Sequence, residues 1–154
     1  MASKVDEQRM REALKEAERA LSVREKPVGA LVVHKTRVVA RAHHQTRTLQ
    51  DPTAHAVVIA ITQAANTLQS EQLTGCTVYV TQEPCCMCLG AVLLSGVSRL
   101  VIGCDDLKEG AAGSVIDLSA HERLNKKLIV VKGVLALECA AILRKAPTSA
   151  RLSS

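Results

Sequence analysis

The sequence predicts an α/β sandwich whose sheet has partly parallel pairing. Along most of its 154 residues, short β-branched runs alternate with apolar or amphipathic helical segments, the pattern of strands covered by helices. Apolar residues make up 47% and charged residues 23%, which excludes a disordered or collagen-like chain. With no Trp, no Phe and one Tyr, Val, Leu, Ile and Ala must form the core. Aromatic platforms for stacking single-stranded nucleic acid are almost absent.

The first half of the chain predicts two helices and a hairpin. Ser3 and Asp6 have the spacing of a capping box, and apolar residues follow on one helix face, so a first helix should end before Pro27. Segments 28–34 and 37–42 are β-branched runs separated by two residues and predict a hairpin. After a polar loop, residues 54–68 are apolar on nearly every face and predict a buried helix.

The second half continues the alternation and completes one domain. The expected elements are a strand at 77–81, a buried helix at 85–95, a strand at 99–103, a loop at 104–114, a strand at 128–132 and a helix at 134–145. There are no repeats and no internal linker. We therefore expect one domain over residues 1–146 and a flexible tail over 147–154.

The net charge and the cysteine content indicate in which compartment the protein works and which kinds of partner it can bind. Lys and Arg number 20 against 15 Asp and Glu, a net charge of +5, which is compatible with a polyanionic partner. The charged N-terminus lacks the apolar region of a secretory signal, and no apolar run approaches the roughly 20 residues of a membrane span. Three of the six cysteines fall within four positions. We expect metal ligation or buried thiols in a reducing cytoplasm, without membrane contact.

The most informative feature is the combination of His55 with Cys85 and Cys88. The two cysteines are i, i+3 partners on one helix face, and Pro84 suits the first helical position, so both thiols should lie at a helix N-terminus, which favours thiolate. His55 should occupy the first turn of its own helix and point past its end. One His and two Cys leave a fourth tetrahedral position open for water, as in a catalytic zinc site.

The cysteines also have interpretations other than metal ligation. A Cys-x-x-Cys pair can be a redox centre, and that remains an alternative for Cys85 and Cys88. Cys86 falls on a different helix face and is expected to be a packed thiol. The same is expected of Cys76, Cys104 and Cys139.

At these residues the chain resembles the zinc-dependent cytidine/adenosine deaminase superfamily and, within it, the bacterial tRNA adenosine deaminases. The matching blocks are Pro27-Val28-Gly29-Ala30, Asp51-Pro52-Thr53-Ala54-His55-Ala56, Val78-Tyr79-Val80-Thr81-Gln82-Glu83-Pro84-Cys85 and Gly110-Ala111-Ala112-Gly113-Ser114, and Glu138-Cys139-Ala140-Ala141 continues the match into the last helix. The resemblance covers about residues 8 to 143. It implies a three-layer α/β/α cytidine-deaminase-like fold with a mixed five-stranded sheet. It also implies Zn²⁺ on His55, Cys85 and Cys88, and hydrolytic deamination of adenosine in a tRNA anticodon loop.

Three departures from the family pattern bear on activity. The family's proton-carrying Glu, two residues after the zinc-binding His, is Val57 here, and valine transfers no proton. The family's Trp-Asn before the active-site helix is His43-His44. The last helix ends in Arg144-Lys145-Ala146-Pro147, where the family has aromatic and arginine residues that hold RNA.

The resemblance also implies substrate contacts and partners. The positions expected to contact substrate are His44, Pro27, Val28, Ala54, Asp106 and Lys108. Lys108, Arg144, Lys145 and Arg151 can contact tRNA phosphates, weakly and with strong salt dependence, or form only a solvated basic edge. The resemblance implies a homodimer, because each active site in the family borrows loops from its neighbour. A heterodimer with an active deaminase subunit is the alternative, because the eukaryotic tRNA deaminase has a non-catalytic subunit that also carries valine at the position of Val57.

Three functional hypotheses therefore stay open. The chain is a tRNA adenosine deaminase homologue that binds zinc but is catalytically deficient because of Val57. Alternatively, it is an active nucleobase or nucleoside deaminase that uses another acid/base, with His44, Asp105, Asp106 and Glu109 as candidates. In the third hypothesis it is a zinc-stabilised binding module that neither deaminates nor needs RNA.

Overall fold

Five strands form one mixed sheet in the order β2-β1-β3-β4-β5. A computed structural model describes residues 2–125 and 127–147. Its elements are α1 (Lys4–Ser22), β1 (Gly29–His34), β2 (Arg37–His43), α2 (Ala56–Leu68), β3 (Cys76–Gln82), α3 (Cys86–Ser95), β4 (Arg99–Cys104), β5 (Ile129–Val131) and α4 (Ala136–Leu143). β1 pairs antiparallel with both β2 and β3, whereas β3-β4 and β4-β5 are parallel. The predicted hairpin and the partly parallel pairing are confirmed.

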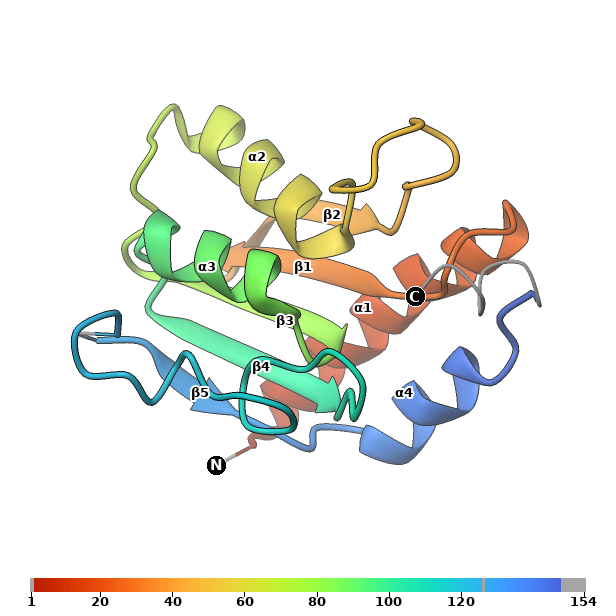
Figure 1. Ribbon diagram of the computed structural model, residues 1–154. Coiled ribbons are helices and arrows are strands. Elements are labelled where there is room, and N and C mark those ends of the chain that lie inside the picture. Colours follow the sequence, from red (N-terminus) through yellow and green to blue (C-terminus); the bar gives the residue numbers. More distant parts are fainter. Residues whose placement is uncertain (1, 126, 148–154) are drawn as a thin grey trace.

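The helices cover both faces of this sheet, which gives the predicted three layers. α2 and α3 pack on one face and α1 and α4 on the other (Figure 1). The central strands β1, β3 and β4 supply fully buried Val, Leu and Ile side chains to both helical layers. Tyr79 is the one aromatic residue of the chain, so the core consists mainly of these aliphatic side chains and of small alanines from α1 and α2.

Several element boundaries differ from the sequence prediction. The helices expected from residues 54 and 85 begin instead at Ala56 and Cys86, each one residue after a predicted metal ligand. The last helix is shorter than expected, because Leu135 has a φ of 54°, a left-handed conformation that no right-handed helix can include. The expected tail is described only at Pro147, since residues 148–154 lie outside the described part of the chain. Among residues 2–125 and 127–147, no helix has the length and hydropathy required to cross a membrane.

A buried carboxylate fastens α1 to the sheet. Asp6 is 1% exposed and completes the predicted capping box with Ser3. Arg99 at the start of β4 donates two hydrogen bonds of 2.8 Å to Asp6, and the Tyr79 hydroxyl of β3 donates a third of 2.9 Å. The Arg99 guanidinium holds the pKa of Asp6 well below its usual range. Burial and the hydrogen bond to Asp6 raise the pKa of Tyr79 to about 12.

The Asp6 network predicts a pH-dependent loss of stability. Because its pKa is lowered in the folded protein, the ionised carboxylate stabilises the fold above the ordinary aspartate pKa of about 3.9, and this stabilisation disappears as pH falls further. Asp6→Asn should lower the free energy of unfolding by about 3 kcal/mol at pH 7, the lower end for breaking a buried pair, because Arg99 is partly exposed. Urea unfolding of wild type and Asp6→Asn at pH 7 and pH 3 measures this difference in the free energy of unfolding.

Glu7→Gln is the matched control, since Glu7 is exposed in the same helical turn and should change stability by less than about 0.5 kcal/mol. The difference between wild type and Asp6→Asn should narrow at pH 3. An unchanged difference at both pH values would contradict the assignment of ionic stabilisation to Asp6.

Candidate metal centre

The N-termini of α2 and α3 lie close together beside one end of β1 and β3. His55 lies at the start of α2, and Cys85 and Cys88 lie at the start of α3. His55 is the N-cap of α2, with extended backbone angles of φ −78° and ψ 149°. Cys85 is the N-cap of α3, with φ −73° and ψ 178°, and Cys88 follows in the first turn of that helix. The predicted places in the first helical turn are thus wrong by one residue for His55 and Cys85. Their side chains leave the chain before the helix begins and can turn toward each other.

The distances within this cluster match those of a tetrahedral zinc site. The His55 Nδ1 atom lies 3.7 Å from the Cys85 sulfur and 3.4 Å from the Cys88 sulfur. Zinc at about 2.0–2.1 Å from nitrogen and about 2.3 Å from sulfur separates tetrahedral N and S ligands by about 3.5 Å. The ligand atoms of all three residues lie within 4.8 Å of one another. The set therefore fits a zinc ion through Nδ1 and two sulfurs.

The Cys85 and Cys88 thiols shift each other's pKa in opposite directions. The neighbouring Cys88 thiol and the His55 ring lower the pKa of Cys85, and the same hydrogen bond together with burial raises the pKa of Cys88. Zinc ligation requires both sulfurs as thiolates. A cation bound between the two sulfurs would take the place of the proton that they share.

The other cysteines divide differently from the prediction. Cys76, Cys104 and Cys139 are buried thiols, as expected. Cys86 is exposed rather than packed, because the first residue of α3 points away from the sheet. It is therefore a natural control for the ligand cysteines.

Val57 lies in the pocket beside the ligand cluster. It is 2% exposed and contributes to the hydrophobic core under α2. The same side chain also lines the pocket that contains His55, Cys85 and Cys88. Val57 therefore packs in the core, and its aliphatic side chain occupies the position where the family resemblance implies a carboxylate.

His44, which the resemblance places among the substrate contacts, lies next to the ligand cluster, although histidines in loops are usually exposed. It is 9% exposed, and its ring centre is 4.6 Å from that of His55, with the ring planes inclined by 38°. Burial lowers the pKa of His44 to about 4, and the positive charges of His55 and Lys26 act in the same direction. A histidine with so low a pKa is largely neutral at pH 7, which makes His44 a weaker candidate for the missing base.

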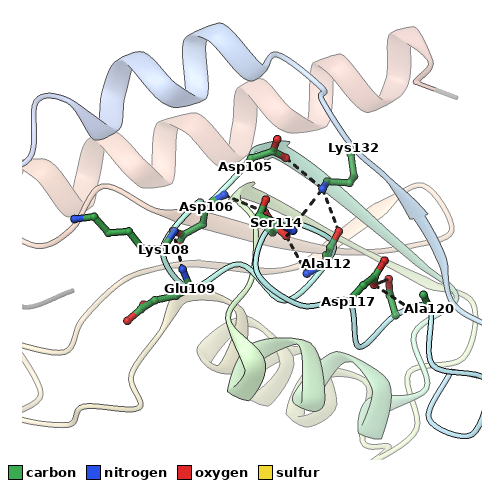
Figure 2. Close-up of polar contacts among 11 residues, drawn as sticks. Asp105, Asp106, Lys108, Glu109, Ala112, Ser114, Asp117, Ala120 and Lys132 are labelled. Atoms are coloured by element: carbon green, nitrogen blue, oxygen red, sulfur yellow. Dashed lines mark hydrogen bonds and ion pairs between the residues drawn. The ribbon is translucent and has the colours of Figure 1, made fainter.

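Only part of the expected substrate-contact set lines this pocket. Val28, His44 and Asp106 do, whereas Pro27, Ala54 and Lys108 do not. Pro27 and Ala54 are buried outside the lining of the pocket. Figure 2 shows the Lys108 side chain extending outward from its loop. Glu109, an expected acid/base candidate, also lines the pocket, and the lining residues that sequence reasoning missed include Lys26, Gln82 and Glu83.

Glu83 organises the loop that forms one wall of the pocket. Its buried carboxylate accepts N–H groups from Asp106 at 3.0 Å, Ala112 at 2.9 Å and Ser114 at 3.0 Å, together with the Ser114 hydroxyl. Burial works to raise the pKa of Glu83, but the hydrogen bonds from Ser114, Asp106 and Ala112 together lower it. A Cβ at Gly110 would lie 2.5 Å from this carboxylate, so the loop can approach Glu83 only because that residue is glycine.

Lys132 closes the same loop from the other side. Its amine donates to the Ala112 carbonyl at 3.0 Å and pairs with Asp105 at 3.3 Å, and Figure 2 shows all three groups converging. Asp106 accepts the N–H groups of Lys108 and Glu109 through one oxygen. Asp105 and Asp106, two of the expected acid/base candidates, are therefore engaged in holding the loop.

The ligand spacing and the surrounding fold coincide with a known sequence profile. The profile of the cytidine and deoxycytidylate deaminase zinc-binding region matches residues 3–104. The chain belongs to this deaminase family. The family's zinc-binding region and the His–Cys–Cys cluster agree on one zinc ion as the cofactor.

Individual relatives within this deaminase family are similar over nearly the whole chain. The tRNA-specific adenosine deaminase of Bacillus subtilis is 44% identical over 138 residues, covering 90% of this chain and 86% of the relative. That of Haemophilus influenzae is 43% identical over 138 residues, covering 89% and 80%. A structure solved in a study of A-to-I editing by tRNA:A34 deaminases superposes with a TM-score of 0.83 at 38% identity, covering 86% of this chain and 96% of that one. The predicted resemblance and the deaminase fold are confirmed.

The geometry predicts which cysteines this deaminase homologue needs to hold zinc. Purified protein should contain about one equivalent of zinc per chain, measured by atomic emission. The double change Cys85→Ser/Cys88→Ser should reduce zinc to background, because a serine hydroxyl is a poor substitute for a thiolate ligand. Cys86→Ser should retain the full equivalent. Equal zinc loss in the Cys86 variant, or full retention in the double variant, would contradict the assignment.

Proposed function

We propose that this chain is a tRNA adenosine deaminase homologue that holds zinc on His55, Cys85 and Cys88 but is catalytically deficient on its own. The observation that carries the proposal is Val57, buried in the first turn of α2 and lining the metal pocket. Bound zinc would supply a Lewis acid that activates water at the ligand cluster. The family's chemistry also needs a side chain that carries protons to the base and its leaving amine, and an isopropyl group carries none.

Two of the neighbouring carboxylates, Glu83 and Asp106, are already engaged in hydrogen bonds and are poorly suited to carry protons. Glu83 is occupied by four donors from the loop, and Asp106 accepts two backbone N–H groups. Glu109 lines the pocket from an exposed part of the loop, and it is the observation that favours a second candidate function, an active deaminase with a relocated acid/base. General acid-base catalysis is worth about 10² to 10⁴ in rate, so this alternative predicts a large effect of Glu109→Gln.

RNA is the proposed partner of the pocket face. The named relatives act on tRNA, and this chain carries a net charge of +5 with exposed basic side chains at Lys108, Arg144 and Lys145. Phosphate contacts need charge and little else. Because aromatic residues are nearly absent, base stacking adds little, and we propose weak, salt-sensitive tRNA binding.

We also propose that this domain, residues 1–146, works as a dimer in the cytoplasm. The outer surface of α3 presents exposed apolar side chains at Met87 and Leu94, which would be covered by a second subunit. A homodimer and a heterodimer with an active deaminase both meet this requirement. In the heterodimer, this chain would supply a structural zinc subunit and part of the RNA surface.

Replacing Val57 tests the proposed lesion directly. Val57→Glu should increase inosine formation from an anticodon stem–loop RNA, by up to about 10² to 10⁴, because the new carboxylate faces the same pocket as the ligands. The glutamine of Val57→Gln has nearly the same shape as the glutamate of Val57→Glu but carries no proton. Inosine formation by Val57→Gln should therefore remain at the wild-type level. Zinc content and circular dichroism of each variant establish that the fold is retained. Wild-type turnover equal to that of Val57→Glu would contradict the proposal, and a loss of turnover in Glu109→Gln would identify the base.

Charge reversal tests the RNA surface. Arg144→Glu/Lys145→Glu should weaken tRNA binding and reduce its salt dependence, because fewer counterions are released on binding. The control Lys4→Glu/Lys15→Glu changes two exposed lysines of α1 and makes the same change in net charge. Fluorescence anisotropy at 50 and 200 mM salt measures both. No detectable binding of wild type at low salt would support the zinc-stabilised binding module instead.

A further inference from the structure

Lys26 is a half-buried cation in the wall of the metal pocket. Its side chain lines the pocket together with the three ligands. Its positive charge contributes, after burial and the charge of His55, to the lowered pKa of His44. Among residues 2–125 and 127–147, no hydrogen bond or ion pair engages the Lys26 amine, and no buried side-chain nitrogen there lacks a partner. The amine is therefore open to the pocket and available to a ligand.

The segment around Lys26 is basic on its exposed side. Arg24 and Arg47 are both exposed, and the Arg47 guanidinium donates to the Arg24 carbonyl at 3.1 Å. Glu25 is fully buried, and its carboxylate accepts the N–H groups of Arg47 at 3.2 Å and Thr48 at 2.7 Å. The negative charge of Glu25 is thus committed to the loop after β2. Arg24, Lys26 and Arg47 form a basic rim on this side of the pocket.

The other side of the pocket is acidic. Asp106 and Glu109 line the pocket there, and the Lys108 side chain extends outward from the same loop (Figure 2). Lys26 precedes β1 and Asp106 follows β4, and β3 lies between these two strands in the sheet. Two strand spacings of about 4.8 Å separate the two sides by about 10 Å. A ligand in the pocket therefore meets positive charge on one side and negative charge on the other.

We propose that Lys26 is a specificity-determining residue that binds a phosphodiester next to the nucleotide whose base enters the metal pocket. This inference rests on the RNA partner of the proposed function. A nucleotide within RNA has a phosphodiester on each side of its sugar, and that negative charge favours the basic rim over the side of Asp106 and Glu109. A lysine ammonium binds phosphate as a point charge. The contact sets the direction in which the RNA strand crosses the pocket, and it selects a nucleotide in RNA over a free nucleobase, which has no phosphate.

A double-mutant cycle between Lys26 and the RNA tests this contact. The RNAs are an anticodon stem–loop and two copies that carry one uncharged methylphosphonate, on the 5′ or the 3′ side of the target adenosine. In fluorescence anisotropy, Lys26→Gln should weaken binding of the unmodified RNA by about 10-fold, the effect of one hydrogen bond to a charged group. One of the two methylphosphonates should weaken wild-type binding to the same extent, and combining it with Lys26→Gln should weaken binding no further. The slope of log K against log salt should fall by about 1 in Lys26→Gln.

Two variants serve as controls for this cycle. Lys26→Arg keeps the positive charge and should keep the sensitivity to the same methylphosphonate. Lys35→Gln removes a charge from the exposed turn at the other end of β1, and its effect should add to that of the methylphosphonate. Zinc content and circular dichroism of Lys26→Gln should match those of wild type, because Lys26 is not a metal ligand.

The outcomes separate this inference from the proposed function. Additive effects of Lys26→Gln with both methylphosphonates would overturn the assignment of Lys26 and leave RNA binding and the Val57 lesion intact. No binding of any of the RNAs at 50 mM salt would overturn the RNA partner, and the role of Lys26 with it. Inosine in RNA recovered from wild type would overturn the catalytic deficiency, whereas the coupling between Lys26 and the phosphodiester would still stand.

Discussion

The convergence of two helix N-termini on one point organises this protein. His55 and Cys85 are the N-caps of α2 and α3, and the parallel and antiparallel pairings of β3 fix where both helices begin relative to the sheet. The helix dipoles favour thiolate at that point. Because this frame depends on buried aliphatic packing and strand pairing, it persists whether or not a proton carrier follows His55, and a deaminase fold can keep its metal site after losing its catalytic carboxylate.

Buried carboxylates hold the irregular segments against this frame. Glu83 gathers the loop that carries Asp106 and Glu109, and Glu25 gathers the loop after His44. Each acts by accepting several backbone N–H groups that a loop cannot otherwise satisfy. The loops on both sides of the pocket are therefore held by carboxylates that take no part in ligation, and the backbone N–H groups already occupy the oxygens of Glu83 and Glu25.

The sequence predicted the sheet, the helices and the three metal ligands, because hydrophobic periodicity and Cys/His spacing are local signals. It missed the placement of His55 and Cys85 as N-caps, since one residue at a helix end depends on backbone angles and not on pattern. It also missed the burial of His44 and the loop contacts of Glu83, whose partners are 23 to 31 residues away in sequence. Such long-range contacts leave no periodic pattern in the sequence, and the same holds for Lys26, which lines the pocket.

We propose that this chain has kept zinc binding without catalysis. A single-turnover experiment tests it most directly: zinc-loaded protein in molar excess over an anticodon stem–loop RNA, with metal content and inosine determined on the same sample over several hours. We predict a full equivalent of zinc and inosine no higher than in RNA incubated alone. Conversion of the RNA to inosine in proportion to the zinc-loaded protein would contradict the account.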